Sequence, residues 1–346
     1  MEDFERVGIG FGKRVKKTKT NQYGWEAVEL KNFNPFKPFV LCLGGNGTTC
    51  DRFANSVAKK VERFLGVKAE DEYVDIYSLR YGLTEGEHIG DISNSEIYNI
   101  TDYIFLPLVV DENRQRISFE QAQKNIRNVN VVTHCFGQTV LNFVLCDLAN
   151  EMSMKLGYAE DEVVQILDQI LNVSYAPKRM VSRLSTNVAF RSMRDSLSAK
   201  KYKEEYEKLT KNNRKLEKIQ IFMENENTVA VYGDSFISQD SDIDEHHFDI
   251  VNRDENWRDK GVFVEDSSEI ETGNLQKEGD LMFLRTELLD QTSTCIANIL
   301  VVGVENSRRN FEDENFEKLM TAEEIAKYIV VPNFEKNVTY TEMQKE

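Results

Sequence analysis

The sequence lacks the long apolar segments and the excess of basic residues that would point to a membrane or a nucleic acid. No run of 18 or more apolar residues occurs, so we expect no transmembrane helix and no membrane partner. The segment Met1–Val15 starts acidic and has no apolar core, so we expect no secretory signal peptide and a cytoplasmic location. The net charge of -16 repels phosphate backbones, so we expect no nucleic-acid partner.

Cysteine and histidine are both scarce. The five cysteines are irregularly spaced and include no Cys-x-x-Cys pair, which argues against a structural zinc site or a thioredoxin-like motif and favours reduced thiols in a cytoplasm. A cysteine or serine mechanism usually needs a histidine base, and few histidines are available for that role. They are His88, His134, His246 and His247.

The most informative segment is Val129–Asn150. An apolar, β-branched run ends in the sequence Thr133-His134-Cys135-Phe136-Gly137, and a helical apolar period follows at once. The pattern predicts a strand, a very tight turn and a helix, with Cys135 at the tip. This matches a nucleophile elbow, in which small residues flank the tip by two on either side because the backbones approach closely there. Thr133 and Gly137 occupy those two positions.

The region from 37 to 176 alternates between strand and helix patterns, which predicts parallel strands joined by helical crossovers. Two strands between residues 6 and 34 are expected to pair antiparallel in front of it. We therefore predict an α/β fold with a mostly parallel sheet flanked by helices. Its expected strands are Lys37–Leu43, Tyr73–Leu79, the run from Val129 and Asn172–Ala176, and its expected helices cover about 51–65, 117–127, 138–156 and 161–171.

The remaining chain divides into three parts that follow the 1–176 core. Residues 177–217 are highly charged and helical in character, which predicts a cap or lid. Residues 218–332 are expected to complete the sheet, with an acidic insertion over 234–280 that holds fifteen acidic and four basic residues. The expected elements here are strands at Ile219–Met223, Val229–Tyr232 and Cys295–Val304, a helix over 321–330 with Thr321 and Glu324 as a capping box, and a flexible tail over 333–346.

The chain resembles the α/β-hydrolase family over about residues 5–176. The opening strand pair, the strand, Gly-rich loop and helix over 37–65, and the turn at 133–137 carry the resemblance. Cysteine in place of the commoner serine is similar to the dienelactone-hydrolase-like members of that family. The resemblance implies that Cys135 is the nucleophile, activated at the N-terminus of the following helix. It also implies an oxyanion hole formed by the backbone of Phe136 and by the Gly44–Gly47 loop, with Gly45 and Asn46 as its donors.

The base and the acid of a triad are each left with alternatives. His246 and His247 follow the elbow in chain order, as the family's histidine does, and His88 is the fallback. His134 should point away from Cys135. The acid is Glu224 or Glu226, after the Ile219–Met223 strand, or Asp234, after the Val229–Tyr232 run.

Several other interpretations compete with these assignments. The Gly44–Gly47 loop could cradle a phosphate, but it lacks GxGxxG spacing and a P-loop Lys-Ser/Thr pair, so we expect no nucleotide cofactor. The acidic group over 240–247 lacks the EF-hand glycine and final glutamate, so we expect no metal. The predicted function is cleavage of a small-molecule or acyl substrate, namely an ester, lactone, thioester or amide. The alternatives are an inactive hydrolase-like protein that binds a basic partner through its acidic surface, and an acyltransferase.

Overall fold

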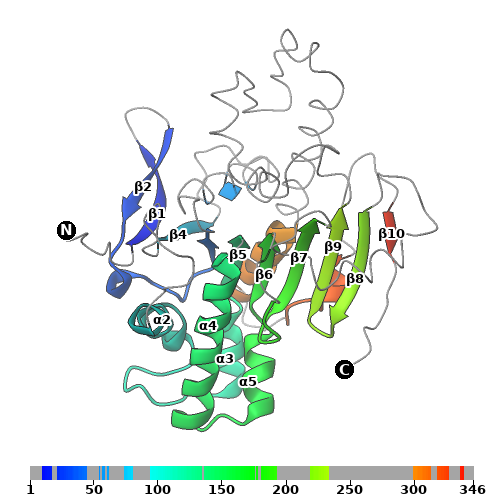
Figure 1. Cartoon of the computed structure of the whole chain (residues 1–346). Helices are drawn as coiled ribbons and strands as arrows, with labels where there is room; N and C mark the ends of the chain where they lie inside the picture. The colour runs from blue at the N-terminus through cyan, green and yellow to red at the C-terminus, as the bar shows by residue number, and fades with distance from the viewer. Residues whose placement is uncertain are drawn as a thin grey trace, which may run out of the picture.

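The computed structural model describes residues 10–17, 22–44, 54, 57–58, 61, 74–80, 94–134, 136–175, 177, 181–192, 219–233, 299–312, 318–326 and 336–338. These residues form a ten-stranded sheet in the order β2-β1-β4-β3-β5-β6-β7-β9-β8-β10 (Figure 1). The strands are β1 (Gly10–Lys17), β2 (Gln22–Ala27), β3 (Phe39–Leu43), β4 (Asp75–Arg80), β5 (Val129–His134), β6 (Leu171–Tyr175), β7 (Thr186–Ser192), β8 (Ile219–Asn225), β9 (Thr228–Gly233) and β10 (Lys336–Val338).

The centre of the sheet is parallel. The run β4-β3-β5-β6-β7-β9 pairs in parallel throughout, whereas β1 pairs antiparallel with both β2 and β4, and β8 pairs antiparallel with β9. Every residue of β3 and β5 is buried, as expected for apolar strands covered on both faces. The predicted mostly parallel α/β sheet and its antiparallel opening pair are confirmed.

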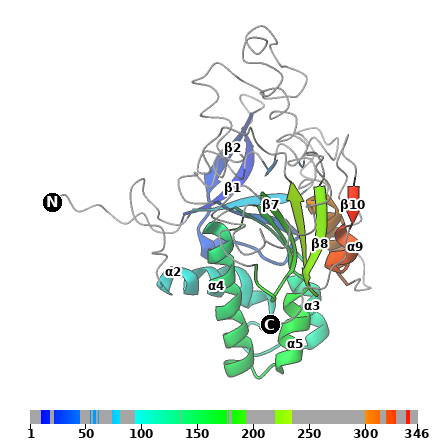
Figure 2. The same cartoon turned by 45° about the vertical axis from the view of Figure 1, so that its right-hand side comes forward.

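Helices cover both faces of this sheet, as the turned view shows (Figure 2). One layer packs on Leu41, Leu43 and Val131 and contains α2, α3, α4 and α5. The other packs on Val40, Cys42 and Val132 and contains the helical residues Ala54, Val57, Ala58 and Val61, a helix over 299–312 and α9. The bounds are η1 (Leu30–Asn32), α2 (Asn94–Ile100), the π-helix η2 (Thr101–Phe105), η3 (Leu106–Leu108), α3 (Phe119–Ile126), α4 (Phe136–Asn150), the π-helix η4 (Glu151–Lys155), α5 (Glu160–Leu167) and α9 (Ala322–Ala326). None of the described helices combines the length and apolar character needed to span a bilayer.

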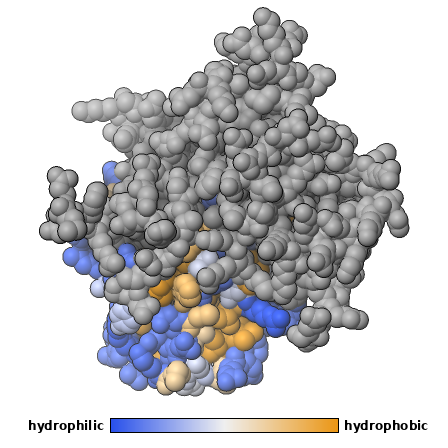
Figure 3. All heavy atoms as spheres, in the orientation of Figure 1, coloured by the Kyte–Doolittle hydropathy of each residue, from blue (hydrophilic) through white to orange (hydrophobic). Residues whose placement is uncertain are grey.

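Helix α4 is apolar around most of its circumference. Its first six residues are all buried, and hydrophobic residues also gather over it on the face drawn in Figure 3. The large apolar side chains that stay exposed on this layer include Phe143 of α4 and Val164 of α5, at 45% and 40%. A helix that is apolar on most sides is stabilised by packing against its neighbours. This packing holds the first turn of α4 against the sheet.

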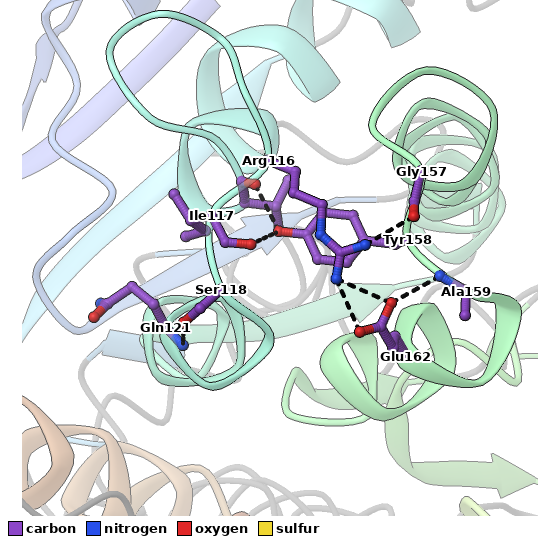
Figure 4. Close-up of polar contacts among 9 residues, drawn as sticks. Arg116, Ile117, Ser118, Gln121, Gly157, Tyr158, Ala159 and Glu162 are labelled. Atoms are coloured by element: carbon purple, nitrogen blue, oxygen red, sulfur yellow. Dashed lines mark hydrogen bonds and ion pairs between the residues drawn. The ribbon is translucent and has the colours of Figure 1, made fainter.

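A polar cluster fastens the outer end of the α3–α5 layer (Figure 4). The guanidinium carbon of Arg116 lies 4.1 Å from the centre of the Tyr158 ring, and the same group donates to a Glu162 carboxylate oxygen at 2.9 Å. The Tyr158 hydroxyl oxygen lies 2.9 Å from the carbonyl oxygens of Val109 and Ile117. These contacts tie the segment before α3 to the segment before α5, so their role is architectural.

The expected strand over Cys295–Val304 is wrong where the structure describes it, because residues 299–312 form a helix. A short continuous apolar run fits a buried strand or a buried helix equally well, and periodicity alone does not separate them. The four-residue spacing of Gly303 and Ser307 supplies the helical signal, since both face the sheet. A Cβ on Gly303 would lie 2.3 Å from a Leu171 methyl carbon and 2.7 Å from Asn130 Oδ1.

Two further expectations are wrong where the structure describes the chain, because strands form in the predicted helical cap and in the predicted flexible tail. Within the predicted helical cap over 177–217, residues 186–192 form β7, which pairs with β6 and β9 inside the sheet, and residues 193–217 lie outside the described residues. Within the predicted flexible tail, residues 336–338 form β10, which pairs in parallel with β8. Both strands depend on partners far away in the sequence, which local charge and composition do not reveal.

The predicted capping box at the last helix is confirmed. The Thr321 hydroxyl accepts from the Glu324 backbone N–H at 3.2 Å, and the Glu324 carboxylate accepts from the Thr321 backbone N–H at 2.9 Å. This reciprocal pair satisfies two donors at the start of α9. It is a local motif and was therefore predictable from four residues of sequence.

Candidate functional site

The sheet has a topological switch point between β3 and β5. These strands are neighbours, but the chain leaves β3 toward β4 on one side and leaves β5 toward β6 on the other. The two connections also lie on opposite faces. The described helical residues after β3, among them Ala54 and Val57, pack with Val40 and Cys42, whereas α4 packs with Leu41 and Leu43. In open α/β sheets, ligands bind outside the carboxyl ends of strands at such a point.

The turn from β5 to α4 lies at this switch point. Strand β5 ends at His134 and α4 begins at Phe136, so one residue, Cys135, separates them; Cys135 itself lies outside the described residues. Phe136 is buried and packs in the core between α4 and the sheet. The predicted strand, tight turn and helix are thus present, with the α4 N-terminus directed to the carboxyl edge of the sheet.

Gly137 is a position that only glycine fits without movement. A Cβ on Gly137 would lie 2.2 Å from the Leu43 carbonyl oxygen and 2.8 Å from the Gly44 carbonyl oxygen. Both are backbone atoms, which do not move aside as the end of a flexible side chain can. The expectation of a small residue here is confirmed, and the backbone that demands it belongs to the end of β3.

The same contact brings the Gly-rich loop to the first turn of α4. Gly44 follows the last residue of β3 and is buried against Gly137. The predicted oxyanion-hole donors Gly45 and Asn46 come next in the chain, outside the described residues. The loop therefore starts beside the turn that carries Cys135.

Thr133, the small residue on the other side of the tip, is part of a buried polar network. Its hydroxyl donates to Gln138 Oε1 at 2.8 Å, and Asn172 Nδ2 donates to the same oxygen at 2.9 Å. Asn172 Nδ2 also donates to Asn187 Oδ1 at 2.8 Å. All four side chains are fully buried. Gln138, Asn172 and Asn187 were not among the predicted site residues, although an amide inside an otherwise apolar strand or helix is a signal for a buried polar contact.

The structure separates the two groups of acid candidates. Strand β8 runs antiparallel to β9, so Glu224 near its end and the exposed Glu226 in the following turn lie at the amino edge of the parallel strands. The β5–α4 turn lies at the opposite, carboxyl edge, so the structure does not bring Glu224 or Glu226 to this turn. This corrects the assignment of Glu224, and of its alternative Glu226, as the acid that follows the Ile219–Met223 strand, because that strand runs opposite to the parallel strands. Asp234 lies outside the described residues, but it directly follows Gly233, the last residue of β9, at the carboxyl edge.

Among the histidines, the structure describes His134 alone. It is fully buried as the last residue of β5, and strand alternation places it on the face of Val132, opposite Thr133. The expectation that His134 points away from Cys135 stays a prediction, because Cys135 lies outside the described residues. The candidates His88, His246 and His247 lie outside the described residues.

Among the described residues, the ionisable groups with shifted pKa values lie away from the β5–α4 turn. Burial, and then the nearby Glu226, raises the pKa of Asp168 to about 7. Asp168 accepts from Asn227 Nδ2 at 2.6 Å, at the amino edge of the sheet. Burial also raises the pKa of Tyr158 in the architectural cluster of Figure 4.

No group of three His, Cys, Asp or Glu side chains arranged to hold a metal occurs among the described residues, and the acidic group over 240–247 is outside them.

No protein-family model matches the chain, and no curated protein matches it significantly. The interpretation of the site therefore depends on its geometry and on the chemistry of its residue types.

Proposed function

We propose that the protein is an α/β-hydrolase-like enzyme that cleaves an ester, lactone, thioester or amide through Cys135. The observation that carries the proposal is the β5–α4 turn: it lies at the switch point of a parallel sheet, and its Gly137 is pressed against the carbonyl oxygens of Leu43 and Gly44. A turn this tight presents the residue at its tip to the crevice outside the strands.

The position at the start of α4 suits a thiolate. The α4 helix has fifteen residues, and its partial positive charge at the N-terminus favours a negative group there. The thiolate is the nucleophilic form of cysteine, so this placement favours reactivity near neutral pH. An adjacent histidine, His246 or His247 with Asp234 as its orienting acid, would complete the activation.

The proposed reaction forms and breaks bonds in two steps. The histidine takes the proton of the Cys135 thiol and becomes an imidazolium. The Cys135 sulfur attacks the carbonyl carbon, and the carbonyl electron pair moves onto oxygen, where the backbone N–H groups of Phe136 and of Gly45 or Asn46 donate to it. Collapse of this intermediate leaves a thioester on Cys135 and expels the alcohol, thiol or amine, which takes a proton from the imidazolium. Water then attacks the thioester with the imidazole as base and releases the acid.

The test is intact-protein mass after brief exposure to p-nitrophenyl acetate. We expect one acetyl adduct on the wild type and none on Cys135→Ala. The matched control is Cys146→Ala, because Cys146 is an exposed free thiol on the same helix. That variant should keep the adduct, since exposure alone does not lower a thiol pKa.

The opposite outcome would end the proposal. A wild-type protein without an adduct, in which Cys135 is alkylated no faster than Cys146, would lack an activated nucleophile and would favour the binding-protein alternative. If the acetyl-enzyme forms but an added amine or alcohol, rather than water, resolves it, the reaction is acyl transfer.

A further inference from the structure

A buried polar network joins the β5–α4 turn to the next two strands of the sheet. Thr133 lies on β5, Gln138 on the first turn of α4, Asn172 on β6 and Asn187 on β7. Asn187 Nδ2 continues the network to the Ser182 and Ser185 carbonyl oxygens at 2.8 and 2.6 Å. The network therefore links three adjacent parallel strands to the start of the helix.

Most of the hydrogen-bonding capacity of the central amides is used. Gln138 Oε1 accepts from both Thr133 and Asn172, and Gln138 Nε2 donates to Asn142 Oδ1 at 2.8 Å. Asn172 Nδ2 uses both of its hydrogens, on Gln138 and on Asn187. Because each amide has one orientation that satisfies its partners, the Gln138 side chain is held in one conformation.

The bond between Thr133 and Gln138 closes a ring across the turn. Thr133 precedes Cys135 by two residues and Gln138 follows it by three, so the 2.8 Å contact ties the last residues of the strand to the first turn of the helix. The surrounding layer is apolar, with Val131, Val140 and Leu141 as neighbours in the same core. Apolar side chains of equal size would fill this space, so stability alone does not call for a buried network here.

We propose that Thr133 and Gln138 are positioning residues for Cys135, holding the first turn of α4 in line behind the nucleophile. This inference rests on the proposed function. The helix terminus acts on a negative group only within about the first turn, so a small change in its direction alters the stabilisation of a thiolate. The network fixes that direction by anchoring Gln138 to β6 as well as to β5.

The test compares two substitutions of Thr133. Thr133→Val keeps the shape and removes the hydroxyl, and Thr133→Ser keeps the hydroxyl and removes a methyl group. We measure the rate of Cys135 alkylation by iodoacetamide against pH, by mass spectrometry of the Cys135 peptide. Thr133→Val should react about three- to tenfold more slowly at pH 7, with its pH profile moved to higher pH, and Thr133→Ser should stay within about twofold of the wild type.

A second variant and a control separate positioning from stability. Gln138→Met keeps the length of the side chain but removes the acceptor, so it should slow Cys135 like Thr133→Val. Ser307→Ala removes a buried hydroxyl that accepts from Asn130 Nδ2 at 3.0 Å at the amino end of β5, away from the turn. Its Cys135 profile should match the wild type even where its stability falls as much.

Hydrogen exchange of the α4 peptide makes the two possible failures distinguishable. Both network variants should exchange faster at the first turn of α4, and Ser307→Ala should not. An unchanged Cys135 profile and unchanged exchange in both variants would overturn the positioning role while leaving the proposed function standing. A wild-type Cys135 no more reactive than Cys146 would instead overturn the function, and the positioning role with it.

Discussion

At the scale of single residues, Gly137 matters both for the packing of α4 against the end of β3 and for the chemistry proposed for Cys135. The Leu43 and Gly44 carbonyl oxygens lie so close that no side chain fits. Gly157, in the turn before α5, offers the useful contrast: its φ is +71°, and a Cβ there would meet nothing within 4 Å. One glycine is required by a neighbour and the other by its backbone conformation.

The first prediction concerns Gly137→Ala. Because backbone must move to admit the Cβ, we expect a loss of at least about 2 kcal/mol in the free energy of unfolding, together with loss of the acetyl adduct on Cys135. Gly157→Ala should cost about 1 kcal/mol through its positive φ and keep the adduct. Urea unfolding and adduct mass would be measured on both variants. A Gly137→Ala protein as stable and as reactive as the wild type would show that the two backbones are not in contact.

Asp168 gives a prediction about pH. Its pKa is raised from 3.8 to about 7, mainly by burial. The folded state therefore binds a proton that the unfolded state has released, so this group's contribution to stability falls as the pH rises from about 4 to about 7. Asp168→Asn keeps an oxygen to accept from Asn227 and has no charge to bury. Because the carboxyl is partly exposed, we expect a modest gain of roughly 1 kcal/mol at pH 8 and little difference near pH 4.

The measurement for Asp168 is the difference in melting temperature between Asp168→Asn and the wild type across this pH range. Glu226→Gln should reproduce a smaller part of the effect, since Glu226 is the second cause of the shift. A melting-temperature difference that stays constant with pH would contradict the raised pKa of Asp168.

At the scale of elements, the helix over 299–312 depends on one buried arginine. Arg127, at the end of α3, donates from Nε to Asn306 Oδ1 at 2.5 Å and from Nη2 to the Gly303 carbonyl oxygen at 2.6 Å. Nη1 lies 3.4 Å from the Gln169 carbonyl oxygen, in the segment before β6. Arg127 is fully buried, so these acceptors depend on it rather than on water.

Arg127→Met should therefore detach this helix. Two close acceptors would remain buried without their donor, and we expect a loss of roughly 3 kcal/mol or more in unfolding free energy. Arg116→Met, in the partly exposed cluster of Figure 4, should cost about 1 kcal/mol or less. Denaturant unfolding would measure the loss of unfolding free energy in both variants. Equal losses would contradict the conclusion that the helix over 299–312 depends on Arg127. Arg127→Lys should not rescue, because an ammonium cannot reproduce the planar fork.

At the scale of the whole molecule, the order of strands creates the candidate site. Gly44 and Gly137 are far apart in the sequence, and they come together at one edge of the sheet because β3 and β5 are neighbours. The order also removes Glu224 from the site, since the β8–β9 hairpin turns it to the other edge. The last residue of β9, Gly233, lies at the carboxyl edge, because β9 pairs in parallel with β7.

The sequence by itself determined the features that are local. The apolar runs of β3 and β5, the helical period of α4 and the capping box at Thr321 each depend on a few neighbouring residues, so their patterns predicted them. The tertiary structure alone decided the direction of β8, the pairing of β7 and β10, the helical state of 299–312 and the network around Gln138. Each of these depends on which distant strand lies alongside, and hydrogen bonding and packing between distant segments settle that choice.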